Sequence, residues 1–119
     1  MAAAILNAAA GSRYLAESAG LFPSRVDPNV VFVMQERGID LSSHHPRSLG
    51  ACSGTVYDTV IFLSPSVREN AYHIPLAGEY VVLNIPVPGI TGADGRDGYR
   101  TLRQTLTNAI GGCFPDAGL

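Results

Sequence analysis

Lysine and tryptophan are absent from this 119-residue sequence, and charged residues of either sign are few. Charged residues make up 15% of the chain and hydrophobic residues 46%, and the formal net charge is −2. Because there is no basic surplus to attract a phosphate backbone, the composition argues against nucleic-acid binding as the main activity. The absence of lysine also excludes a lysine nucleophile or Schiff base.

Long hydrophobic runs and paired cysteines are missing as well. No apolar stretch approaches the roughly 20 residues that span a bilayer, and the alanine-rich start at 1–10 lacks the basic flank of a signal peptide. We therefore expect a cytoplasmic protein that does not engage a membrane. Cys52 and Cys113 lie far apart and form no CxxC motif, so we expect two reduced thiols. With no repeat or linker, residues 1–119 are expected to form a single domain.

Alternating helix and strand patterns predict an α/β fold with a mostly parallel sheet. Three strands are expected, the last two apolar enough to be buried, at 14–18, 56–63 and 80–85. Helices are expected at 1–10, from Asp27-Pro28 to Gly38, from Ser64-Pro65 to Glu69, and at 99–110 before two glycines. Ligands of parallel sheets bind beyond the carboxyl ends of the strands. The loops after Ser18, Leu63 and Ile85 are therefore the first places to look for a site.

Several short motifs follow one another in a recognisable order. Ser18-Ala19-Gly20 follows the first predicted strand, Gly38-Ile39-Asp40 ends the next helix, and Arg47 stands two residues before a leucine. The strand sequence YDTVIFL comes next, and SVRE at 66–69 follows it. This ordered set resembles the low-molecular-weight protein tyrosine phosphatase and arsenate reductase superfamily over nearly the whole chain. The resemblance implies the phosphotyrosine phosphatase I-like fold, a three-layer α/β architecture with a short, mostly parallel sheet.

The catalytic parts that the resemblance implies are missing from this chain. Family members carry a C-x5-R-S loop between their first strand and first helix, whose cysteine thiolate attacks while backbone N–H groups and the arginine hold the oxyanion. Here the residues 1–6, MAAAIL, resemble the family's M-A-E-A-L-L, which follows that loop. The family's general-acid aspartate, in an I-P-D-P segment, is replaced by Val87. Because valine cannot carry a proton, the sequence as written is not a phosphatase or arsenate reductase.

Two interpretations remain open. Val87 favours a catalytically degenerate protein that acts as a binding or regulatory module or has been repurposed for other chemistry. The alternative is a phosphatase or arsenate reductase whose N-terminal catalytic loop is missing from this chain, with Met1 an internal methionine. Without the family's first strand, the strand at 14–18 must pair directly with 56–63, or another chain must fill the gap. The exposed apolar face of the first helix would then favour a homodimer.

The sequence identifies no catalytic residue. Cys52, assisted by His44 or His45, is a candidate for repurposed nucleophilic chemistry. No spacing positions these three together, so we interpret them as an ordinary thiol and surface-loop histidines and expect neither a metal nor a cofactor.

A ligand-binding set is expected near the strand ends, and its ligand is expected to be a small anion, with a protein partner as the alternative. Tyr99 is included because it resembles the aromatic residues that line the family's substrate cleft. The full set is Ser18, Arg47, Pro86, Val87 and Tyr99.

Overall fold

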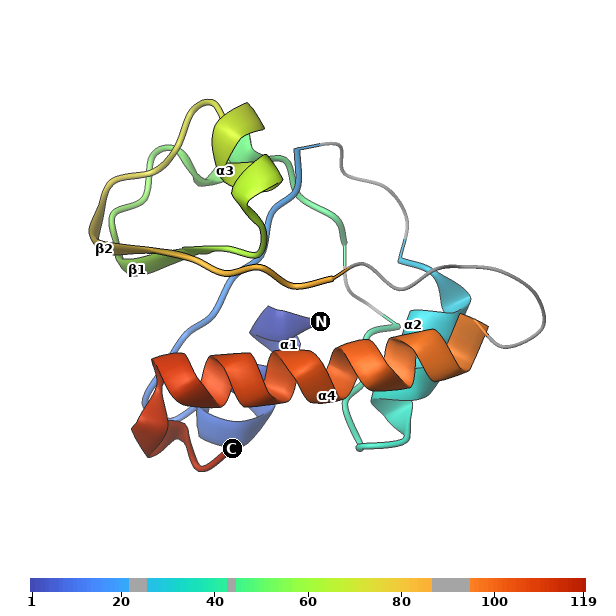
Figure 1. The fold of residues 1–119 in the computed structure, drawn as a ribbon. Coiled ribbons are helices and arrows are strands. Elements are labelled where there is room, and N and C mark those ends of the chain that lie inside the picture. Colours follow the sequence, from blue (N-terminus) through green and yellow to red (C-terminus); the bar gives the residue numbers. More distant parts are fainter. Residues whose placement is uncertain (22–25, 43–44, 87–94) are drawn as a thin grey trace. The chain divides into compact units, whose positions relative to one another are not determined.

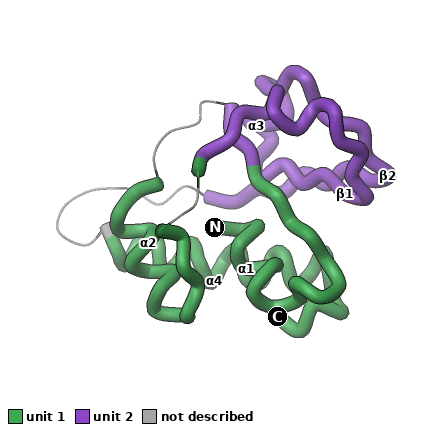
Figure 2. Tube along the Cα trace, turned by 180° about the vertical axis from the view of Figure 1, so that it is seen from behind, with its two compact units in different colours: residues 1–18, 26–45, 87–119 green, residues 19–25, 46–86 purple. Residues whose placement is uncertain are grey.

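The computed structural model describes residues 1–21, 26–42, 45–86 and 95–119. Its elements confirm the expected α/β class (Figure 1): α1 (Ala2–Ala10), α2 (Pro28–Gln35), β1 (Tyr57–Phe62), α3 (Pro65–Asn70), β2 (Ala77–Val82) and α4 (Gly95–Cys113), with short 3-10 turns at Leu49–Cys52 and Pro115–Ala117. The chain divides into two compact units (Figure 2). Unit 1 comprises residues 1–18, 26–45 and 87–119, and unit 2 comprises residues 19–25 and 46–86.

Unit 1 is helical, and α4 packs against both α1 and α2. Its most deeply buried side chains are Val33, Met34 and Leu106. The helix α2 begins as the sequence predicts, because the Asp27 carboxylate accepts a hydrogen bond from the Asn29 backbone N–H at 2.8 Å. It ends before Gly38, whose positive φ of 72° is the left-handed conformation that favours glycine. The capping residues of this helix were therefore readable from the sequence.

The helix α4 differs from its predicted span at both ends. It begins before residue 99 and continues through Gly111 and Gly112 to Cys113, so the prediction that two glycines end it was wrong. A Cβ built on Gly111 would lie 3.3 Å from the Cβ of Leu119, which shows that the C-terminal segment returns close to this turn of the helix. Glycine costs a helix interior about 1 kcal/mol relative to alanine, but a side chain at Gly111 would crowd Leu119.

Unit 2 contains a two-stranded parallel sheet in which Tyr57 is opposite Ala77 and Phe62 is opposite Val82. The pairing continues past β2, because the Ile85 N–H donates to the Leu63 carbonyl at 2.9 Å. β2 begins at Ala77, before the predicted start at residue 80, and the backbone pairing reaches the predicted end at Ile85. The helix α3 contacts β1 and begins at Ser64, whose hydroxyl accepts a hydrogen bond from the Val67 N–H.

The strand expected at 14–18 is not formed, so this prediction was wrong. The Asn7 side chain hydrogen-bonds both backbone groups of Ala16: it accepts from the Ala16 N–H and donates to the Ala16 carbonyl, each at 2.8 Å. These groups are then not available to a sheet ladder. Within the described residues the sheet has two strands, and direct pairing of 14–18 with β1 does not occur.

The burial expected of both apolar strands was only partly correct. Phe62 at the end of β1 is buried, but Tyr80 and Val82 on β2 are 46% and 48% exposed. A parallel strand is buried on both faces only when helices or further strands cover them, and here α3 is the element of unit 2 that packs on β1. In the described part of the chain, no helix is both long and apolar enough to cross a membrane.

Candidate functional site

The structure brings two of the sequence motifs together in unit 2. Gly20, the last residue of the Ser18-Ala19-Gly20 motif, forms a parallel bridge with Ser48. The Gly20 N–H donates to the Arg47 carbonyl at 2.9 Å, and the Leu49 N–H donates to the Gly20 carbonyl at 3.2 Å. This short stretch of pairing fixes the backbone of Arg47, the charged residue that the sequence selects for anion binding.

Among the predicted site residues that the structure describes, Arg47 and Cys52 contact each other directly. The Arg47 guanidinium Nη2 donates to the Cys52 Sγ at 3.1 Å. Cys52 lies in the 3-10 turn Leu49–Cys52, is a free thiol and is 5% exposed. The turn brings this thiol back toward Arg47, five residues earlier in the chain. A buried thiol in this position is packed as a small hydrophobic group and is poorly placed to attack an external substrate.

The histidines proposed as assistants of Cys52 are not joined to it in the described contacts. His45 is exposed and belongs to unit 1, and His44 lies outside the described residues. Among the described residues, no group of three or more His, Cys, Asp or Glu side chains is arranged to hold a metal ion. The side chain that hydrogen-bonds the Cys52 thiol is Arg47. An arginine stays protonated, so it cannot act as the base that a nucleophilic thiol needs.

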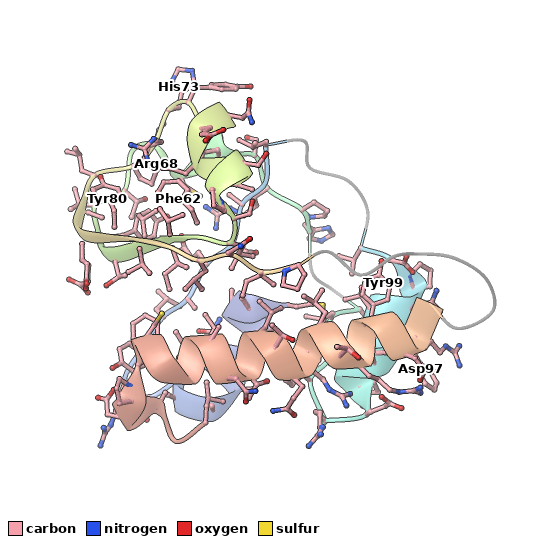
Figure 3. All side chains as sticks on the ribbon, in the orientation of Figure 1. Phe62, Arg68, His73, Tyr80, Asp97 and Tyr99 are labelled. Carbon is pink, nitrogen blue, oxygen red and sulfur yellow. The ribbon has the colours of Figure 1, made fainter. Side chains whose placement is uncertain are left out.

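Pro86 and the aromatic residues of the sheet also belong to unit 2. Pro86 is exposed just after the last backbone bond of β2, and Val87 lies outside the described residues. On the sheet, the Phe62 and Tyr80 rings stack with centroids 6.4 Å apart, and Arg68 lies over the Phe62 ring at 5.5 Å (Figure 3). Arg68 therefore packs on an aromatic ring of its own unit, which is a structural role.

The remaining predicted residues, Ser18 and Tyr99, belong to unit 1. Ser18 is half-buried in an irregular segment. The Tyr99 ring is buried, and its hydroxyl donates to Asp27 at 3.2 Å, so that α4 is fastened to the first turn of α2. Burial, with a contribution from the Asp27 carboxylate, raises the pKa of Tyr99.

Unit 1 also contains two charged clusters that the sequence did not predict. In the first, Glu36 at the end of α2 accepts hydrogen bonds from Arg100 at 2.9 Å and from Arg103 at 3.0 Å. Arg103 also donates to the Val33 carbonyl at 2.7 Å and so satisfies a backbone acceptor near the end of α2. The Arg100 hydrogen bond, helped by Arg103, lowers the pKa of Glu36 to about 2. The spacing of the two arginines along one helix face was the available signal, but their partner on α2 was not visible in the sequence.

The second cluster holds the C-terminal segment. The Tyr14 hydroxyl donates to Asp116, and Arg13 forms an ion pair with the same carboxylate at 3.3 Å. The Tyr14 and Phe114 rings pack with centroids 4.9 Å apart. The hydrogen bond between Tyr14 and Asp116 raises the pKa of the tyrosine and lowers that of the carboxyl group. Segments from opposite ends of the chain are thereby joined.

These observations define an α/β protein with a parallel β-α-β unit. A family model described as low molecular weight phosphotyrosine protein phosphatase matches residues 1–82. The chain therefore belongs to the low-molecular-weight phosphotyrosine phosphatase family, which confirms the resemblance drawn from the motifs. The matched span includes Gly20, Arg47 and both strands, and it ends at the last residue of β2. A search of curated proteins found no match.

Proposed function

We propose that this chain is a catalytically degenerate member of its family and acts as a binding or regulatory module. The observation that carries the proposal is Val87, which stands where the family resemblance implies the general-acid aspartate. Proton transfer from a positioned side chain contributes typically about 10²–10⁴-fold to such reactions. A valine cannot protonate a leaving group, and this substitution does not depend on where the chain begins.

The surroundings of Cys52 support the same proposal. A nucleophilic thiolate needs an accessible sulfur and N–H donors arranged around the oxyanion. Cys52 is instead 5% exposed and sits inside a 3-10 turn against Arg47. Hydrolysis by this thiol would require the turn to open.

The ligand proposed for the module is a small anion or a protein segment that carries one. Arg47 is half-buried with its backbone fixed by Gly20. A guanidinium carries five N–H donors in a rigid fork, and Nη2 of Arg47 donates to Cys52. A single cytoplasmic domain that self-associates as a homodimer, without a metal or cofactor, belongs to the same proposal.

Hydrolysis of para-nitrophenyl phosphate, a phosphotyrosine analogue, tests the proposal directly. The purified 119-residue chain is expected to show no thiol-dependent turnover, and Val87→Asp is expected to restore none, since a general acid alone has no nucleophile to serve. Cys52→Ser and Cys113→Ser form a matched pair of controls. Saturable hydrolysis that Cys52→Ser abolishes and Cys113→Ser preserves would overturn the proposal.

A second candidate is a phosphatase or arsenate reductase whose catalytic loop lies outside this chain. It is favoured by β1, which has the apolar sequence of an interior strand yet pairs with a single strand among the described residues. An intact mass of the protein from its native cells decides between the candidates. A mass near 12.5 kDa supports the module. A heavier protein that reduces arsenate or hydrolyses the analogue supports the enzyme.

A further inference from the structure

We draw no further inference here: the strongest candidate, the exposed apolar surface that β1, α3 and β2 present in unit 2, carries none because nothing in the described part of the structure shows what covers it.

Discussion

The two units of this chain use their apolar residues in opposite ways. Among the described residues, unit 1 contains nearly all of the buried apolar side chains, whereas unit 2 buries Cys52, Phe62 and Pro75. Most of the exposed large hydrophobic side chains belong to unit 2: Val56, Leu63, Val67, Tyr72, Leu76, Tyr80 and Val82. A set of crossing helices can close a core from the helices' own apolar faces. A two-stranded parallel sheet with one short helix cannot cover both of its faces.

This contrast leads to different expectations for substitutions in the two units. The helix contacts of unit 1 are reinforced by ion pairs between α2 and α4 and by the Tyr14–Asp116 hydrogen bond. Unit 2 carries the strand ends and Arg47, and its apolar surface is the kind that partners or ligands cover. We therefore expect substitutions in unit 1 to act on folding, and changes in unit 2 to act on local opening and binding.

The largest expected effect comes from the core of unit 1. Met34 has no exposed surface, so Met34→Ala should lower the free energy of unfolding by about 2–5 kcal/mol. The matched change in unit 2 is Val82→Ala, on a half-exposed side chain, and should stay within about 0.5 kcal/mol. Urea denaturation of both variants measures the difference. Equal losses of unfolding free energy in the two variants would show that the sheet is covered in solution and would contradict the contrast between the two units.

An intermediate effect is expected on the rate at which a thiol reagent modifies Cys52. If unit 2 opens more readily than unit 1, Cys52 should become accessible to a thiol reagent at urea concentrations where the helices are still folded. The rate of modification in Cys113→Ser, compared with helical circular dichroism, measures this. Modification of Cys52 that coincides with loss of the helices would mean that the two units unfold as one.

The smallest expected effect concerns the ion cluster at the end of α2. Because its pKa falls from 4.5 to about 2 in the folded protein, ionised Glu36 stabilises the fold above pH 4.5. This stabilisation is lost as the pH falls from 4.5 toward 2. Glu36→Gln should therefore lower Tm at pH 7, with a difference from the parent that shrinks below pH 4.5 and in high salt.

The control for the ion cluster is Glu79→Gln, on an exposed residue of β2. The Tm of this variant should be nearly the same as that of the parent at pH 7 and at pH 3. A Tm loss in Glu36→Gln that is the same at pH 7 and pH 3 would show that the effect comes from packing and not from charge.

Local signals explain most of what was predictable. Asp27-Pro28 marks the start of α2, Gly38 follows its end, and Ser64 caps the start of α3. These signals are local because a cap satisfies backbone groups of its own helix and needs no distant partner. The motifs around Gly20 and Arg47 likewise identified the family, since their order and spacing lie within the matched part of the chain. Of the candidate site, the sequence indicated Arg47 but not its contact with Cys52.

The α/β class, the caps of α2 and α3 and the family follow from local patterns in the sequence. Three other features depend on the folded chain. The Asn7 side chain hydrogen-bonds both backbone groups of Ala16, α4 continues past Gly111 beside Leu119, and Glu36 pairs with two arginines of another helix. Each of these results depends on a partner outside the helix or strand whose propensity was considered. Asn7 and Ala16 are 9 residues apart in the chain, whereas Glu36 and Arg100 are 64 residues apart. The propensities of a strand or a glycine are worth about 1 kcal/mol, so a single well-placed tertiary contact can override them.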